Sequence, residues 1–338
     1  MTKIDVISGF LGAGKTTFIK KILKEALKGE KVVLIENEFG EIGIDGGFLK
    51  DAGIEIREMS QGCICCSLVG DFETALKEVI SIYQPERVII EPSGVGKLSD
   101  VMKAVNDASA NLDVVLNSAV TIVDANKCKM YMKNFGEFFN NQVQYAGTIV
   151  LSRTDVASND KVQKDVELIR ELNKEAEIIT TPVEELQGEK ILSIMEKKEN
   201  MLDELMASVK AEHEHHHHEH DEHCDCGCHD HEHHHDHEHH HHHADEVFSS
   251  WGRENVPAID KEKLEAILKK LAETEEFGIV LRAKGMLKAK ESDGWYYFDL
   301  VPGEYEIRDG EAEYTGKVCV IGRYIDEAEL IKAFNEEV

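Results

Sequence analysis

The sequence lacks any apolar run that approaches the roughly 18 residues that a helix needs to cross a bilayer. Its first residues, MTKIDVISGF, contain no apolar signal-peptide core and read instead as a strand that starts almost at once. Nothing therefore suggests export or membrane spanning, and we expect a cytoplasmic protein. In such a reducing compartment, the eight cysteines are expected to be thiols or metal ligands rather than disulfides.

Basic residues are also scarce. There are 38 Lys and Arg against 66 Asp and Glu, and the formal net charge is −28. Nucleic acids and anionic membrane surfaces are polyanions, so this balance argues against both as partners and favours cations. With 338 residues, 42% of them hydrophobic, the chain is long enough for two domains that each bury a core.

Histidine is absent from most of the chain, because all 18 histidines lie between His213 and His243, interleaved with acidic residues. Such a composition cannot form an apolar core, so we predict a disordered tether between two domains. An expression tag and a merely solvated linker are the alternatives, although the tract is internal and broken by acids. Imidazole and thiolate groups together favour Zn²⁺, Co²⁺, Ni²⁺ or Cu, and we interpret the tract as a metal collector. Its candidate ligands include Cys224, Cys226, Cys228 and His229.

A phosphate-binding loop follows the first predicted strand. The sequence GFLGAGKTT begins at Gly9 and fits the pattern G-x-x-x-x-G-K-[ST], with an amphipathic helix after it. The glycines allow backbone N–H groups to face phosphate oxygens. Lys15 would reach the β and γ phosphates, and the Thr16 hydroxyl would coordinate Mg²⁺.

An acidic loop follows the next predicted strand. Residues 31–35 read as a buried strand of a parallel sheet, and the polar stretch ENEFGEIGID then contains Glu36, Glu38 and Glu41. The loop is either a solvated connector or a switch region whose carboxylates face Mg²⁺ or a second metal. The residues alone leave these alternatives level.

Two further strand ends carry polar residues that suit a nucleotide. The strand at 87–90 ends in Glu91, an expected second Mg²⁺ contact, and Gly94 would let the backbone sense the γ-phosphate. The strand at 148–151 ends in SRTD, whose Asp155 can accept hydrogen bonds from N1 and N2 of guanine. Ligands sit at such strand ends in doubly wound sheets. A helix N-cap is the alternative role for the acid or serine.

Three thiols lie between these nucleotide motifs, at Cys63, Cys65 and Cys66 in SQGCICCSL. They cannot all be buried core sulfurs, because neighbouring side chains on an extended segment point to opposite faces. We interpret them as ligands of a metal whose binding the nucleotide controls. By contrast, Cys128 and Cys319 are expected to be core residues.

The C-terminal part of the chain predicts a small α+β domain with one layer of helix on a sheet. No catalytic constellation is visible in it. The expected elements are a helix at 261–271, strands at 278–283, 295–301 and 317–322, and a helix at 327–336. We therefore divide the chain into a nucleotide-binding domain at 1–205, the metal-binding linker at 206–250 and the C-terminal domain at 251–338.

Together these motifs resemble the CobW-type P-loop GTPases, a family of metal-handling NTPases. The matches are GFLGAGKTT, ENEFGEIGID, GCICCSL, EPSG and SRTD, in the family's order, while RAKG and VCVIGR look like its second domain. The resemblance implies an α/β P-loop fold with a doubly wound, mainly parallel sheet. It implies nucleotide contacts from Gly12, Ala13, Gly14, Lys15, Thr16 and Thr17.

The resemblance also implies Mg²⁺ at Thr16 with Glu91 nearby, and base recognition by Asp155. Metal would bind at the three thiols, with Glu36 and Glu41 as carboxylate neighbours. Ser152 and Arg153 depart from the usual Asn-Lys-x-Asp motif. Arg153 can still pack its guanidinium over a base. Ser152 is too short to reproduce the Asn contacts, so GTP is favoured but its selection over ATP stays open.

The leading hypothesis is a GTPase metallochaperone that loads a transition metal, zinc first and cobalt next, into an unidentified client metalloprotein. Lys15, Thr16 and Glu91 would form its catalytic set. GTP and Mg²⁺ would order the acidic loop and close the thiolate site, and hydrolysis would release both. Turnover should be slow, because no arginine finger in cis is evident.

Two other functions fit the same residues. One is a cytosolic metal buffer that acts through the histidine tract, and the other is an activator of a cobalt- or corrinoid-dependent enzyme. A homodimer is an arrangement that the sequence leaves open.

Overall fold

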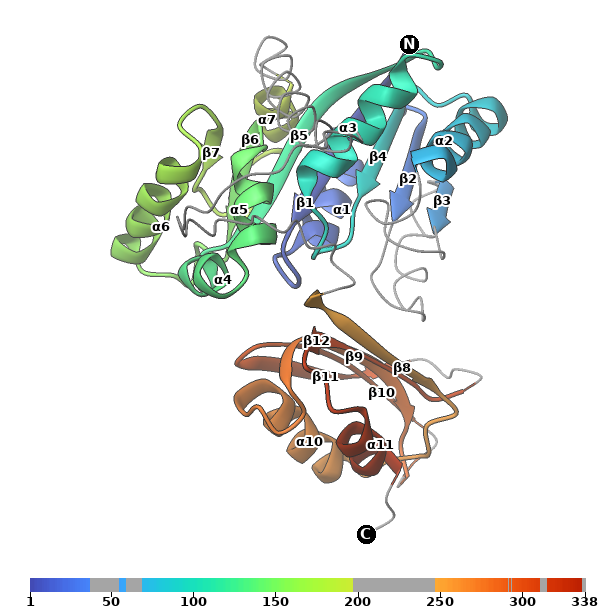
Figure 1. The fold of residues 1–338 in the computed structure, drawn as a ribbon, viewed down its shortest axis with the longest axis vertical. Coiled ribbons are helices and arrows are strands. Elements are labelled where there is room, and N and C mark those ends of the chain that lie inside the picture. The colour runs from blue at the N-terminus through green and yellow to red at the C-terminus, as the bar shows by residue number, and fades with distance from the viewer. Residues whose placement is uncertain are drawn as a thin grey trace, which may run out of the picture.

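The structure is a computed structural model that describes residues 1–36, 55–58, 69–196, 247–290, 292, 294–310 and 315–335. These residues form two sheets with helices packed on them, one in each half of the chain (Figure 1). The first is a seven-stranded sheet, and the second is a five-stranded sheet.

The seven-stranded sheet is parallel in every strand pairing, in the order β3-β2-β4-β1-β5-β6-β7. Its strands are short apolar runs, as expected for strands that helices cover on both faces. This confirms the predicted α/β fold, although β3 was not anticipated. The strands are β1 Thr2–Gly9, β2 Val32–Glu36, β3 Glu55–Glu58, β4 Arg87–Glu91, β5 Val114–Asp124, β6 Thr148–Ser152 and β7 Glu177–Ile179.

Two hydrophobic cores lie on opposite faces of this sheet. Helices α1 and α7 cover one face, where Phe18, Ile22 and Ile191 are buried against the strands. Helices α2 to α6 cover the other face. Their bounds are α1 Lys15–Glu25, α2 Val69–Tyr83, α3 Leu98–Ser109, α4 Cys128–Asn134, α5 Gly136–Gln144, α6 Asn159–Leu172, the 3₁₀ turn η3 Val183–Glu185, and α7 Gly188–Met195.

The strand order reverses at β1, which lies between β4 and β5. The chain first adds strands on the β4 side and then crosses to the β5 side. Connections on either side of such a switch point diverge and leave a crevice outside the carboxyl ends of the strands. The phosphate-loop motif directly follows β1 and so lies at this crevice.

The five-stranded sheet is antiparallel, in the order β11-β10-β9-β12-β8. Helices α10 and α11 pack on one face through residues such as Leu264, Leu268 and Phe334, which confirms the predicted single helical layer. The elements are β8 Ser249–Glu254, α10 Lys261–Glu273, β9 Ile279–Lys288, β10 Trp295–Val301, β11 Glu304–Gly310, β12 Lys317–Arg323 and α11 Glu327–Asn335. The edge strands β8 and β11 were not anticipated, and β8 begins just before the predicted boundary at 251.

The other face of this second sheet meets the first domain. Met286, Cys319 and Ile321 belong to the same hydrophobic core as the helices of the first domain. In Figure 1 the sheet accordingly lies between the first domain and its own helices. Just before β8, Phe248 packs against Phe138, with ring centroids 5.0 Å apart. The two domains are therefore joined by buried apolar contacts.

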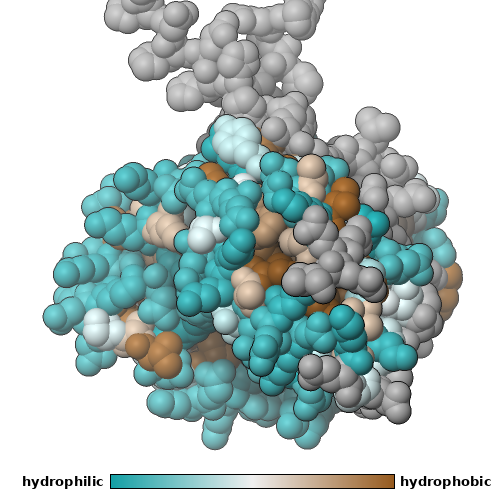
Figure 2. Space-filling model, turned by 90° about the horizontal axis from the view of Figure 1, so that it is seen from below, coloured by the Kyte–Doolittle hydropathy of each residue, from teal (hydrophilic) through white to brown (hydrophobic). Residues whose placement is uncertain are grey.

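Hydrophilic side chains cover most of the molecular face at the C-terminal-domain end, with a few hydrophobic side chains grouped near its centre (Figure 2). The apolar faces of α10 and α11 are used within the domain, where both helices contribute buried leucines to its core. None of the helices in the described stretches combines the length and apolar character needed to cross a membrane.

Candidate functional site

The phosphate loop is formed by the turn between β1 and α1. Gly9 has φ +146°, and a Cβ at this position would lie 2.5 Å from the backbone oxygen of Ile122 on the neighbouring strand β5. No side chain can be placed there without moving the sheet, so the loop requires glycine at this point. The N-terminus of α1 then directs its first backbone N–H groups toward the crevice, which suits a phosphate.

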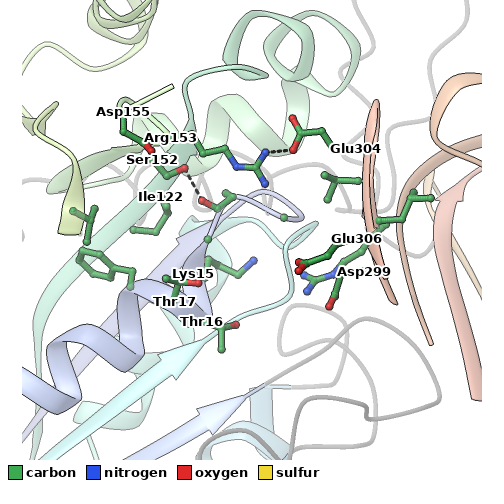
Figure 3. A pocket seen from close by; sticks show the side chains of 18 of the residues that line it. Lys15, Thr16, Thr17, Ile122, Ser152, Arg153, Asp155, Asp299, Glu304 and Glu306 are labelled. Atoms are coloured by element: carbon green, nitrogen blue, oxygen red, sulfur yellow. Dashed lines mark hydrogen bonds and ion pairs between the residues drawn. The ribbon is translucent and has the colours of Figure 1, made fainter. Parts of the chain in front are cut away.

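A cavity of about 530 Å³ opens in front of this loop, and both domains line it (Figure 3). The first domain contributes residues 12–18 with Glu91, Ile122, Ser152, Arg153, Asp155, Val183 and Glu184. The second contributes Arg282, Asp299, Leu300, Val301, Glu304, Tyr305 and Glu306. Most of the residues predicted to contact nucleotide are thus brought together.

Two predicted contacts lie elsewhere. Gly9 forms the base of the loop but is not among the described lining residues. Gly94 packs behind the loop, where an added Cβ would lie 2.9 Å from the backbone nitrogen of Leu11. Its carbonyl oxygen accepts a hydrogen bond from Nε2 of the buried Gln142 at 3.1 Å. Gly94 therefore supports the loop from behind in this structure.

Oxygen ligands suited to Mg²⁺ gather beside the loop. The Thr16 hydroxyl donates to the Glu91 carboxylate, with oxygen–oxygen distances of 3.1 and 3.4 Å. Glu36, at the end of β2, is the register partner of Glu91 at the end of β4 and is buried. Hydroxyl and carboxylate oxygens are the ligands that Mg²⁺ prefers, so these residues fit the ion. Nζ of Lys15 meanwhile donates to the backbone oxygen of Gly9 at 3.0 Å.

At the far end of the cavity, Ser152 replaces the asparagine of the usual guanine motif. Its hydroxyl donates to the backbone oxygen of Ala13 at 2.7 Å, which ties strand β6 to the phosphate loop. The Ser152 side chain is short, but its hydroxyl still reaches the phosphate loop. Asp155 is exposed at the cavity wall, where its carboxylate is available to a base.

The guanidinium of Arg153 is held by acids from both domains. Its Nε lies 3.5 Å from the Asp124 carboxylate, and its Nη1 donates to Glu304 of β11 (Figure 3). Glu304 also lies 3.8 Å from Nζ of Lys127. The sequence predicted Arg153 beside the base but gave no sign of this interdomain pairing.

Burial is the largest influence on the pKa of two members of this cluster. It raises the pKa of Asp124, against the opposing effect of the Arg153 charge and a backbone hydrogen bond. It lowers the pKa of Lys127, although Glu304 and Asp124 act in the other direction. Among the described residues, Asp124 Oδ2 and Lys127 Nζ have no hydrogen-bond partner. Asp124 Oδ2 and Lys127 Nζ therefore interact with the cluster through charge at distances of 3.5 and 3.8 Å, while Arg153 and Glu304 are in direct contact.

Most of the ligands predicted for the cargo metal lie outside the described residues. These are Cys63, Cys65, Cys66 and Glu41 of the ordered site and Cys224, Cys226, Cys228 and His229 of the tract. Glu36 is the exception. Within the stretches that the structure does describe, no three His, Cys, Asp or Glu side chains gather as a metal site.

The two remaining cysteines are buried free thiols, which confirms that they are core residues. Burial raises the pKa of Cys128 to about 12. Because the thiolate is the nucleophile, iodoacetamide at pH 7.5 should leave Cys128 unmodified in the folded protein and modify it in urea. Peptide mass spectrometry measures this. Modification of the folded protein at the rate seen in urea would show that the thiol is accessible.

Sequence reasoning missed the wall that the second domain adds to the cavity. Arg282 lies in RAKG and alternates with the next residue, Ala283, which is buried in the core of the second domain, so its side chain is expected on the opposite face of the strand. That alternation was a usable signal. The alternation does not show which residues this face of the strand contacts, because that depends on how the two domains dock.

Two family models match this chain, one in each half. The family model described as "CobW/HypB/UreG, nucleotide-binding domain" matches residues 3–180. A second model, described as "Cobalamin synthesis protein cobW C-terminal domain", matches residues 248–338.

Individual relatives are similar over part of their length. The zinc chaperone YjiA of Escherichia coli (strain K12) is 32% identical over 183 residues, which cover 52% of this chain and 56% of the relative. The zinc chaperone CobW of Sinorhizobium sp is 34% identical over 190 residues, covering 47% and 53%. This chain spans about half the length of the curated relatives it matches. The solved structure of Zn(II)-bound YjiA GTPase from E. coli aligns over 98% of both chains, at 21% identity and a TM-score of 0.42.

Proposed function

This chain belongs to the CobW/HypB/UreG family, and on that premise we propose that it is a GTP-hydrolysing metallochaperone that binds zinc and delivers it to a client protein. One observation carries the proposal. Glu36, from the predicted cargo-ligand set, is the register partner of Glu91, whose carboxylate lies 3.1 Å from the Thr16 hydroxyl. This position supports the proposal, because Glu36 could link the cargo metal to the residues expected to hold the nucleotide's Mg²⁺.

The phosphates of GTP would bind at the N-terminus of α1 and the loop before it. Lys15, which now donates to its own loop's carbonyl oxygens, would exchange these contacts for phosphate oxygens. Thr16 and Glu91 would hold Mg²⁺, which neutralises negative charge on the phosphates when bound. The base would lie toward Asp155, whose carboxylate can accept from N1 and N2 of guanine.

The cargo metal is a substrate of the protein rather than a resident cofactor. We assign its ordered site to Cys63, Cys65 and Cys66, with Glu36 and Glu41 as carboxylate neighbours. Zinc is the first candidate because thiolate-rich sites suit it, and two similar proteins are named zinc chaperones. Cobalt is the second. Binding must be reciprocal, so a tenfold tightening of metal by GTP means a tenfold tightening of GTP by metal, about 1.4 kcal/mol.

The decisive measurement is a zinc titration of the wild type and of Lys15→Ala, with and without Mg-GTP. We expect GTP to tighten zinc binding in the wild type by about tenfold. The Lys15→Ala variant should keep the affinity measured without nucleotide and lose the response, because its phosphate contact is gone. Lys24→Ala, an exposed change on the same helix, should respond as the wild type does. Zinc affinity that ignores GTP in the wild type would refute the coupled mechanism.

A metal buffer that acts through the histidine tract is the second candidate, because the tract holds all 18 histidines of the chain. Deleting residues 212–243 separates the two functions. The chaperone should keep its GTP-dependent tight site and then lose it when Cys65 is replaced by serine. A buffer would instead lose nearly all of its zinc capacity with the tract.

A further inference from the structure

The C-terminal sheet presents one row of side chains to the phosphate loop. In that row, Arg282 of β9 lies opposite Ile321 of β12, and Glu304 of β11 lies opposite Val301 of β10. Leu300 lies opposite Ala283, so the next step of the same register places Val301 opposite Arg282. Residues directly opposite one another in an antiparallel sheet share a face.

Two members of this row, one on each side of Arg282, show what the face contacts. Ile321 is buried in the core of the first domain. Val301 lies against the phosphate loop, since a Cβ on Gly12 would be 2.2 Å from its Cγ1. Arg282 lies between these two residues and lines the same cavity as Lys15 and Thr16. The register therefore brings a guanidinium from the second domain to the phosphate-binding crevice.

Among the described residues, Arg282 is the one lining cation that forms no hydrogen bond or ion pair. Lys15 donates to backbone oxygens of its own loop. Arg153 lies between Asp124 and Glu304. The Asp299 carboxylate, on the same wall, is engaged by Arg308 at 2.8 Å. The Glu306 carboxylate, which also lines the cavity, lies 3.9 Å from the same Arg308. A partly buried cation without an ion-pair partner loses hydration that no direct contact replaces, and an anion bound in the cavity would provide such a contact.

We propose that Arg282 is a catalytic residue which the C-terminal domain supplies in cis to the phosphates of the bound nucleoside triphosphate. This role rests on the proposed GTPase function and deepens it. In the reaction, a water oxygen forms a bond to the γ-phosphorus, and the bond from that phosphorus to the β–γ bridging oxygen breaks. The bond's electron pair stays on that oxygen. The proton that the attacking water loses passes to an oxygen of the transferred phosphate, which leaves as inorganic phosphate. Arg282 donates hydrogen bonds to phosphate oxygens and keeps its own proton throughout.

A consequence is that turnover requires both domains to be docked. The sequence alone suggested slow hydrolysis for want of an arginine in cis. The geometry points to such an arginine, carried on an element that is remote in the sequence.

The test compares steady-state GTP hydrolysis by the full-length wild type, Arg282→Ala and Arg282→Lys. We expect Arg282→Ala to lower kcat by about 100-fold or more, while KM and GDP affinity stay within about threefold. Lysine should restore only part of the rate, since a point charge does not replace a planar fork of donors. Arg253→Ala on β8, in the same domain, should hydrolyse GTP as the wild type does.

A second readout separates catalysis from folding. With GDP and aluminium fluoride, which together imitate the transferring phosphoryl group, the wild type should form a complex that Arg282→Ala does not form. Two results would overturn the role of Arg282: a kcat within about threefold of the wild type, or a parallel loss of GDP binding and thermal stability. A wild type that does not hydrolyse GTP would overturn the proposed function itself, and this role with it.

Discussion

Replacing Arg87 with methionine should lower the free energy of unfolding by about 3–5 kcal/mol. The Arg87 side chain is 3% exposed and forms ion pairs with three acids. It pairs with Asp5, lies 2.8 Å from Glu30 and lies 2.9 Å from Glu196. Removing one partner of a buried pair leaves the other charge without compensation. The predicted loss is a large fraction of the stability of an ordinary domain.

Of the three acids, Asp5 would lose the most stabilisation when Arg87 is replaced. It lies on the central strand β1, is 1% exposed and accepts a hydrogen bond from the Ser118 hydroxyl at 2.6 Å. Burial alone would lower the pKa of Arg87, but the Asp5 charge and the hydrogen bonds to the acids outweigh it and raise the pKa. Glu30 and Glu196 are more than a quarter exposed, so water can hydrate them when the arginine is gone.

Urea unfolding followed by two signals would check this prediction. Both tryptophans of the chain lie in the C-terminal sheet, Trp251 in that domain's own core and Trp295 in the core shared with the first domain. Their fluorescence therefore reports the C-terminal domain and its interface, while circular dichroism reports both domains. Arg87→Met should move the circular dichroism midpoint more than the fluorescence midpoint. Adding Asp5→Leu should recover part of the loss, because the unpaired carboxylate is removed. An unchanged circular dichroism midpoint would contradict the prediction.

The first domain was predictable because its signals are local. A buried parallel strand is a short continuous apolar run, and a phosphate loop has glycines at fixed positions. Both signals can be read within ten or so residues, and the structure places them as expected in β1, β2, β4, β5 and β6. Polar residues at strand ends then meet in one crevice, because parallel strands share a carboxyl edge.

The elements that were missed have no local signal. β8 and β11 are edge strands with charged residues, and natural edges carry charge because it blunts pairing with other chains. Their sequences, SSWGRE and EYEIRDG, show little of the apolar alternation that indicates a strand. An edge strand is defined by the neighbour with which it pairs, and that neighbour is distant in sequence.

Only the part of the cavity wall that the first domain contributes could be predicted from the sequence. Residues 12–17 could be assigned from motif chemistry, but the pairing of Arg153 with Glu304 joins residues 151 positions apart in sequence. Such a contact depends on the docking of two domains, which neither motif nor periodicity encodes. The same applies to Arg282, whose strand could be predicted while the surface that it faces could not.

Gly12→Ala should disturb the docking of the two domains, at a total cost of about 2–5 kcal/mol. Gly12 has φ +69°, which disfavours any residue with a Cβ, and the new atom would lie 2.2 Å from Cγ1 of Val301. Since Gly12 also lines the cavity, GTP affinity should fall together with stability. Isothermal titration with GTP and urea unfolding followed by tryptophan fluorescence measure the two effects.

Two matched variants separate the backbone cost of Gly12→Ala from the cost of its contact with Val301. Gly29→Ala has a similar φ of +86°, and nothing lies within 4 Å of its new Cβ, so it measures the backbone cost alone. Val301→Ala removes the methyl groups that Gly12→Ala would meet. The change at Gly12 should therefore cost at least about 1 kcal/mol less in the Val301→Ala background. If the two substitutions are additive instead, the domains do not meet at this contact. The assignment of Arg282, which lies in the same row of side chains, would then lose its geometric basis.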